Sequence, residues 1–177
     1  MSDEFRGIHQ ASQLLAQYKK SRDLELIRSV PISDIKRFDV WQSVFEEEPE
    51  AFRELEIKKM YETFGRNHYH GDDESTRKIC RRMAMTLAVT FIDRKIEYPK
   101  HAHLSIEDLL RIVVDVFGVE ILDDLRTEAK EHVAQREEII KPYFEKDNTW
   151  VQYAKDGMAE IEKFKLTITE VIDTVSV

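Results

Sequence analysis

The chain has 177 residues, of which 42% are hydrophobic and 35% are charged, a balance typical of one globular domain. Five glycines and four prolines are too few for a turn-dense all-β architecture, and one cysteine, Cys80, excludes an internal disulfide. The formal net charge of -8 disfavours indiscriminate binding to nucleic acid, because like charges repel.

Three further features predict a cytoplasmic protein that does not enter a membrane. No segment contains the roughly 18 consecutive apolar residues that a transmembrane helix needs. The first ten residues, MSDEFRGIHQ, are acidic and polar, unlike the basic start and apolar run of a signal peptide. The single cysteine is typical of a reducing compartment.

Helical spacing of apolar residues begins near the N-terminus and continues past two prolines. The first helix is expected to have a narrow apolar stripe. It consists of Phe5, Ile8 and Leu15, with Ser12 between them. Pro31 suits the first turn of a second helix, whose apolar residues are Ile35, Phe38, Trp41 and Phe45. Pro49 breaks or restarts this pattern, and the next apolar positions are Phe52, Leu55, Met60, Tyr61 and Phe64.

The segment GRNHYHGDDES, residues 65–75, predicts a loop, and Ser75 is the expected N-cap of the helix that follows. The second half of that helix, from Met83 to Ile92, has almost no polar face, which predicts a central position in the domain. The next helix is the most regular: Ser105 caps it, its apolar residues fall at helical spacing, and Gly118 ends it. Another helix, starting near Leu122, stops near Pro142.

The C-terminal segment keeps apolar or small residues at alternating steps of four and three, which predicts a helix with a heptad seam. The seam consists of Trp150, Ala154, Gly157, Ile161, Phe164, Ile168, Val171 and Val175. The last ten residues are rich in Thr, Ile and Val, so a terminal strand is the alternative there. We therefore expect an all-α, single-domain bundle of six or seven helices over residues 1–177, with residues 148–177 as a candidate projecting arm.

Basic side chains cluster at the start of the helix that follows Ser75. Residues 63–104 contain eight Lys or Arg and five Asp or Glu, a net of +3, whereas the rest of the chain has a net of -11. One patch is expected from the i, i+4 spacing of Arg77, Lys78, Arg81 and Arg82. These four residues are the candidate nucleic-acid contact, through phosphate or an acidic partner. The alternative is that they pair with acidic residues of the same chain.

Two His-X-His pairs flank this basic helix, at residues 68–70 and 101–103. The segment HYHGDD resembles the His-x-His-x-Asp loop of β-lactamase-type metallo-hydrolases, which implies a metal site. A helix of some 20 residues is about 30 Å long, so pairs at its two ends cannot share an ion. We expect no metal and no cofactor, and we expect Cys80 to be a packing residue.

The segment RTEAKEH resembles the Arg-X(4–6)-His motif of HEPN-type ribonucleases, which are small helical bundles. That resemblance implies catalytic roles for Arg126 and His132. Residues 104–130 are loosely similar both to the DNA-binding domain of the bacterial replication initiator and to acyl carrier protein. Two unrelated similarities in one segment indicate generic helix-turn-helix packing, so no family is assigned.

The absence of a catalytic signature favours a non-enzymatic helical subunit that binds other macromolecules. Its expected partners are a protein or further copies of itself, with nucleic acid as a second option through the basic helix. The alternative is an enzyme, either a HEPN-like ribonuclease or a metal-dependent enzyme that uses the histidines.

Overall fold

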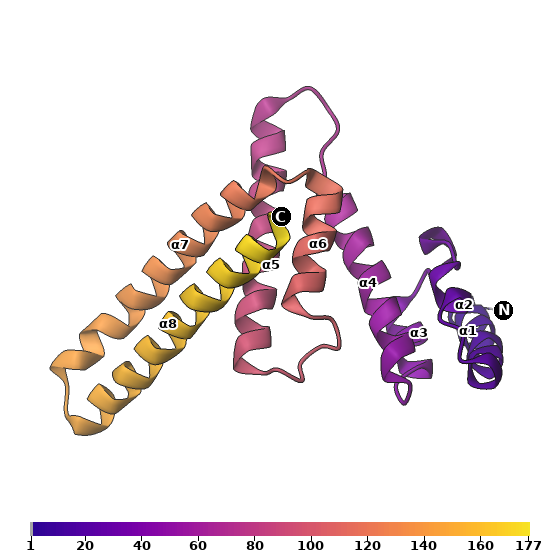
Figure 1. The fold of residues 1–177 in the computed structure, drawn as a ribbon, viewed down its shortest axis with the longest axis horizontal. Helices are drawn as coiled ribbons and strands as arrows, with labels where there is room; N and C mark the ends of the chain where they lie inside the picture. The colour runs from indigo at the N-terminus through magenta and orange to yellow at the C-terminus, as the bar shows by residue number, and fades with distance from the viewer. Residues whose placement is uncertain (1) are drawn as a thin grey trace.

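Helices alone build the protein in a computed structural model that describes residues 2–177 (Figure 1). The helical elements are α1 (Asp3–Ser21), α2 (Glu25–Arg28), η1 (Ile32–Asp34), α3 (Phe38–Val44), α4 (Pro49–Arg66), α5 (Glu74–Glu97), α6 (Ile106–Phe117), α7 (Ile121–Ile140), η2 (Lys141–Glu145) and α8 (Asn148–Val175). The chain is 79% helical, with no strand among the described residues. The all-α prediction is confirmed, and the alternative of a terminal strand is wrong.

Helix ends follow the local chemistry of the sequence in most places. Ser105 and Asp108 form a capping box at the start of α6, and Gly118 ends that helix with a φ of 91°. Pro49 occupies the first turn of α4. The predicted cap at Ser75 is two residues late, because Asp73 caps α5 by accepting a hydrogen bond from the Ser75 backbone N–H.

The segment after Pro31 does not form one continuous helix. Pro31 precedes the short 3-10 helix η1, and an extended stretch separates η1 from α3 at Phe38. The apolar residues at helical spacing are nevertheless buried, among them Ile35 and Trp41. The helical spacing therefore predicted correctly which residues are buried. Its prediction of one continuous helix was wrong.

Two clusters of buried side chains lie along the chain, and α4 belongs to both of them. The smaller cluster joins α1, α2, α3 and the first half of α4, with Tyr18, Phe45 and Leu55 at its centre. The larger cluster joins the end of α4, at Phe64, to α5, α6, α7 and α8. Helix α4 packs along α6, which connects the two parts of the molecule (Figure 1).

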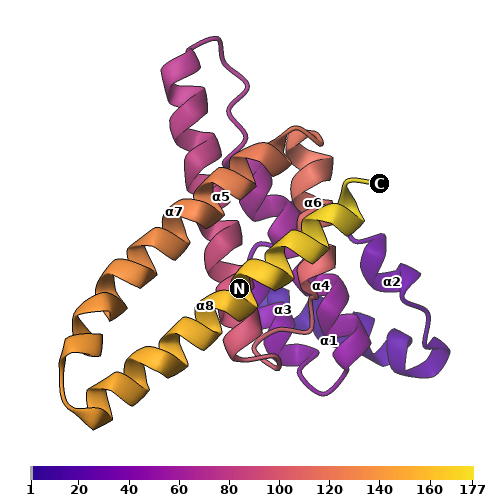
Figure 2. The ribbon, with the colours of Figure 1, turned by 60° about the vertical axis from the view of Figure 1, so that its left-hand side comes forward.

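Helices α7 and α8 form an antiparallel hairpin whose tip points away from the rest of the molecule (Figure 2). The predicted seam of α8 faces α7 and the core, since Ala154, Ile161 and Phe164 are buried. The helices approach closely at Gly157, where an added Cβ would lie 2.7 Å from Ile140 Cδ1. The projecting part is thus the hairpin tip, while the later turns of α8, with Ile168 and Ile172, lie in the larger cluster.

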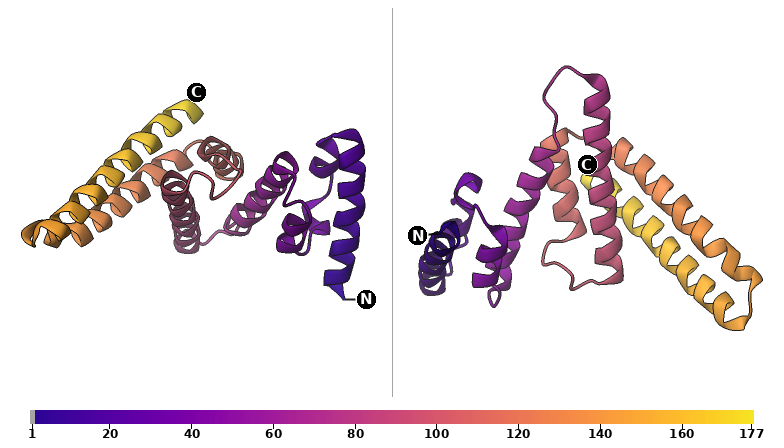
Figure 3. Two further views of the ribbon diagram at one scale, coloured as in Figure 1. Left: turned by 90° about the horizontal axis from the view of Figure 1, so that it is seen from below. Right: turned by 180° about the vertical axis from the view of Figure 1, so that it is seen from behind.

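Helix α5 contacts α6, α7 and α8, as expected for a central helix. Seen from behind, however, it runs along the near side of the molecule (Figure 3). Ala84, Met85 and Ala88 are buried, whereas Met83 and Leu87 are exposed. The predicted central position therefore describes the buried face of α5, and a second face is exposed. None of the helices within residues 2–177 has the length and apolar character needed to cross a bilayer.

Candidate interaction surfaces

The basic residues of the predicted nucleic-acid contact lie on the first half of α5, and two of them face α7. Arg81 Nη2 lies 2.7 Å from Asp124 Oδ2, and Arg82 Nη2 lies 2.6 Å from Glu131 Oε2. Glu128 also approaches Arg82, with its Oε2 3.7 Å from Arg82 Nε. These carboxylates stand 43 to 49 positions further along the chain than their arginines.

The other two basic residues have partners close in sequence. Lys78 Nζ lies 3.1 Å from Glu74 Oε1, one turn earlier on α5, and both side chains are largely exposed. Arg77 Nη2 donates a hydrogen bond of 2.8 Å to the backbone carbonyl of Gly71 in the preceding loop. All four basic side chains therefore contact oxygens of the same chain, as the alternative prediction stated.

A groove of about 430 Å³ separates the start of α5 from α7, and all four basic residues line it. Four acidic side chains line it as well, so the groove is close to electrically neutral. One buried donor in the groove is unpaired: Arg81 Nε has no hydrogen-bond partner among the residues described. A phosphate in this groove would have to compete with the carboxylates that already pair with Lys78, Arg81 and Arg82.

Beside this groove, α5 presents an exposed apolar stripe. Ile79, Met83 and Leu87 follow one another at intervals of four residues, and their exposed fractions are 62%, 55% and 45%. Residues at this interval lie on one face of a helix. Single exposed apolar residues are common on protein surfaces, and three at this spacing on one helix face make this face a candidate contact surface.

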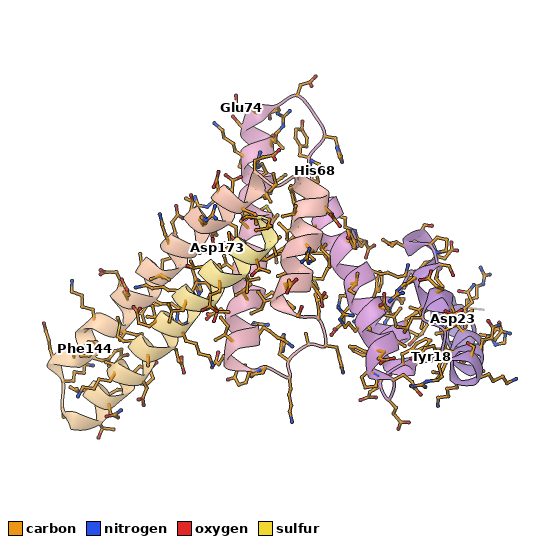
Figure 4. All side chains as sticks on the ribbon, in the orientation of Figure 1. Tyr18, Asp23, His68, Glu74, Phe144 and Asp173 are labelled. Carbon is orange, nitrogen blue, oxygen red and sulfur yellow. The ribbon has the colours of Figure 1, made fainter. Side chains whose placement is uncertain are left out.

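A second exposed apolar surface lies at the tip of the α7–α8 hairpin, which Phe144 marks (Figure 4). Four large side chains there are exposed by between 44 and 65%, namely Ile139, Phe144, Trp150 and Tyr153. We call this group, together with the half-buried Tyr143, the aromatic tip. Aromatic residues are enriched at the centres of protein–protein interfaces, where they contribute much of the binding energy.

Contacts within the aromatic tip hold its rings in a fixed arrangement. The Tyr143 and Trp150 rings are stacked, with centroids 5.3 Å apart and planes inclined by 29°, and Tyr153 meets Tyr143 edge-on at 5.4 Å. Lys146 Nζ lies 4.8 Å from the Tyr143 ring centroid, a cation–π contact. Neither the Trp150 indole N–H nor the Tyr153 hydroxyl has a hydrogen-bond partner in the described part of the chain. A ligand can therefore use both.

The two His-X-His pairs have different neighbours. The rings of His68 and His70 contact each other in a tilted arrangement with centroids 4.3 Å apart, whereas His103 contacts the ring of Phe52, also tilted, at 4.8 Å. Burial lowers the pKa of His68, and the neighbouring His70 and arginines lower it further. Within residues 2–177, no group of three or more His, Cys, Asp or Glu side chains is arranged to hold a metal ion.

Arg126 and His132 have different polar partners. Arg126 pairs with Asp123 one turn away and approaches Asp173 of α8 at 3.8 Å. His132 Nε2 lies 3.0 Å from Asp93 Oδ2 of α5, which also accepts a hydrogen bond from Arg136. Burial alone would raise the pKa of Asp93, but these hydrogen bonds outweigh it and the pKa is lowered. The geometry gives this histidine a structural partner and does not bring Arg126 beside it.

Comparison with protein-family models, curated proteins and solved structures gives no match to this chain. Function is therefore inferred from the surfaces themselves. The aromatic tip was not among the sites predicted from sequence, although Trp150 was assigned to the heptad seam. The sequence does indicate it, because four aromatic residues fall within positions 143–153.

Proposed function

We propose that this protein is a non-enzymatic interaction subunit that docks onto a partner protein through the aromatic tip of its α7–α8 hairpin. The observation that supports this proposal is the group of exposed, mutually stacked aromatic side chains on a projecting element. An exposed apolar cluster of this kind costs free energy in water unless a partner covers it. Its unused polar groups at Trp150 and Tyr153 would orient the partner.

The charge around the tip favours protein over nucleic acid as the partner. Residues 137–156 contain five Asp or Glu and three Lys, a net of -2. Aromatic rings can stack on bases, but single-strand binding surfaces combine such rings with positive charge that follows the backbone. The same net charge disfavours an anionic lipid surface. A partner with an apolar pocket and a basic rim fits the tip best.

The other predicted functions have weaker geometric support. Arg126 and His132 have different polar partners and form no hydrogen bond with each other, which argues against the HEPN-like ribonuclease. A nucleic-acid contact through Arg77, Lys78, Arg81 and Arg82 stays a prediction, since each of these side chains already contacts an oxygen of the same chain. A cytoplasmic location likewise stays a prediction from the single cysteine and the lack of long apolar segments.

The proposal is tested by capture of partners with matched baits. Tagged wild-type protein, the double variant Trp150→Ala/Tyr153→Ala and the control Leu166→Ala are cross-linked in the native host and purified. Leu166 is an exposed apolar residue of the same helix outside the tip. Proteins that wild type and the control both enrich, and the tip variant does not, are the expected result. Equal enrichment by all three baits would refute docking through the tip.

A further inference from the structure

A groove runs beside α1, where residues of η1 and α3 face it. It consists of two hollows of about 210 and 310 Å³, and three residues, Gln10, Asp34 and Trp41, line both of them. Its α1 wall extends from Arg6 to Gln17, which is about 16 Å at the rise of an α-helix. We call it the α1 groove. Helix α1 and the aromatic tip lie at opposite ends of the molecule (Figure 1), so this groove is separate from the proposed docking site.

Trp41 of α3 points a hydrogen-bond donor into this groove. The residue is only 3% exposed, and its indole N–H has no hydrogen-bond partner among the described residues. Nε1 lies beside Gly7, which lines the smaller hollow: a Cβ added at Gly7 would be 3.9 Å from it. The missing side chain of this glycine therefore leaves the N–H open to the hollow. An indole N–H only donates, so the groove offers a place for an acceptor atom of a ligand.

The two hollows differ in charge. Three basic residues, Arg6, Lys36 and Arg37, line the smaller hollow, and none lines the larger one. Arg37 binds Asp39 through two hydrogen bonds, whereas Arg6 and Lys36 form no ion pair with any described side chain. The side chain of Asp34, at the junction of the hollows, is also without a partner in the described part of the chain. A ligand that fits therefore brings a negative charge to the smaller hollow and a donor to the junction.

Apart from the junction carboxylate, the larger hollow is lined by uncharged polar and apolar residues. Gln10, Gln13 and Gln17 follow one another on one face of α1 and are exposed. Glutamine amides both donate and accept hydrogen bonds, as the peptide backbone does. Leu14 and Val30 are partly buried and give the hollow apolar walls. This half of the groove suits an uncharged peptide segment.

We propose that the α1 groove binds the C-terminal residues of a partner protein in an extended conformation. The terminal carboxylate occupies the smaller hollow, where it accepts the Trp41 N–H and lies beside Arg6 and Lys36. The backbone N–H of the same residue donates to Asp34, and the preceding residues extend toward Gln17. An extended peptide spans at most about 3.5 Å per residue, so about five residues fill the groove.

Other anions fit less of the groove. A free amino acid carries the same carboxylate but would leave the larger hollow empty. A phosphate carries up to two negative charges, and Asp34 at the junction opposes the second. The side chain of an internal Asp or Glu shares the carboxylate chemistry within a continuing chain, and the experiment below separates it from a chain end. The inference goes beyond the proposed function, because the aromatic tip takes no part in this binding.

Binding of synthetic peptides to the full chain tests the proposal. Two libraries of random pentapeptides are compared, one with free C-terminal carboxylates and one with C-terminal amides. We expect selection from the carboxylate library, and amidation should weaken a selected peptide at least about 10-fold, because hydrogen bonds to a charged group are lost. Selection from neither library, or equal binding of a peptide and its amide, would overturn the proposal. Selection of acidic residues from the amide library alone would assign the carboxylate to a side chain and overturn the terminal assignment.

Variants test whether a selected peptide occupies the groove. Lys36→Gln and Trp41→Phe should each weaken binding of a labelled peptide about 3- to 10-fold in fluorescence anisotropy. Lys20→Gln, at an exposed lysine of α1 outside the groove, is the matched control and should bind like wild type. Gly7→Ala tests the same donor without changing the core, since it adds a methyl group beside Nε1 and alanine suits a helix. It should weaken binding without lowering the Tm. Unchanged affinity in Lys36→Gln, Trp41→Phe and Gly7→Ala would overturn the site.

Fluorescence locates the bound peptide independently. The chain has two tryptophans, so Trp150→Phe leaves Trp41 as the only one, and its emission should change saturably as the peptide binds. Binding that leaves this emission unchanged would contradict a carboxylate at the indole. The tip variant Trp150→Ala/Tyr153→Ala should bind the peptide like wild type. Loss of partner capture by that variant with peptide binding intact concerns the tip alone, so the two proposals fail separately.

Discussion

The contact between Arg53 of α4 and Asp108 of α6 provides a quantitative test of how the two parts of the molecule are joined. The guanidinium binds the carboxylate bidentately, with Nη2 2.7 Å from both oxygens and Nε 3.1 Å from Oδ2. Asp108 also accepts the Ser105 backbone N–H at 3.1 Å as part of the capping box. Its side chain is 21% exposed and that of Arg53 is 41% exposed.

We expect Asp108→Asn to lower the free energy of unfolding by about 1.5 to 2 kcal/mol. Hydrogen bonds to charged groups contribute about 1.5–3 kcal/mol, and the partial exposure of Arg53 reduces this value. For a chain of this length the change corresponds to a Tm lower by about 3 to 8 °C. Urea unfolding followed by circular dichroism measures both quantities.

The matched control is Glu107→Gln, one residue earlier in the same helix turn. It removes the same charge from the helix N-terminus, and its lost partner, Arg111, is an exposed neighbour one turn away at 2.7 Å. We expect a cost of about 0.5 kcal/mol or less. If the two variants lose equal stability, the α4–α6 ion pair contributes nothing beyond its helix-end charge, and the reasoning is refuted.

The pH dependence gives an independent check on Asp108. Burial alone would raise its pKa, but the bonds from Arg53 and Ser105 outweigh burial and hold the pKa below its usual value. An aspartate whose pKa is lower in the folded state stabilises the fold above its unfolded pKa of about 3.9, and this contribution is lost as pH falls through the folded value. The difference between wild type and Asp108→Asn should therefore be constant from about pH 5 to 8 and shrink below about pH 4.

Three further predictions concern the tip, the core and the basic helix. Trp150 is 45% exposed and Trp41 only 3%, so iodide should quench the fluorescence of Trp41→Phe strongly and that of Trp150→Phe weakly. Phe164 is 1% exposed in the larger cluster, so Phe164→Ala should cost about 3 to 5 kcal/mol in urea unfolding. If the basic helix binds nucleic acid, replacing its four basic residues with Gln should weaken binding of all sequences equally and flatten its salt dependence in fluorescence anisotropy. No binding by wild type at low salt would contradict this.

The sequence predicted α6 well because all its determinants are local. The capping box at Ser105, the apolar spacing and Gly118 lie within 14 residues, and each acts through the backbone of its own helix. The seam of α8 was predicted for a similar reason, since its spacing is a property of one helix. Helices α5, α6 and α7 cover most of it, while Trp150 at its start is exposed. Short segments such as α2 and η1 lack this redundancy, and tertiary packing decides their form.

The surroundings of α5 could not be predicted locally. Apolar residues on all sides of a helix indicate burial only if enough neighbours exist, and the number of neighbours depends on where every other helix lies. Similarly, the i, i+4 rule placed the basic residues in one patch, but the carboxylates that pair with Arg81 and Arg82 come from α7. The aromatic tip needed the turn at η2 to bring Tyr143 against Trp150.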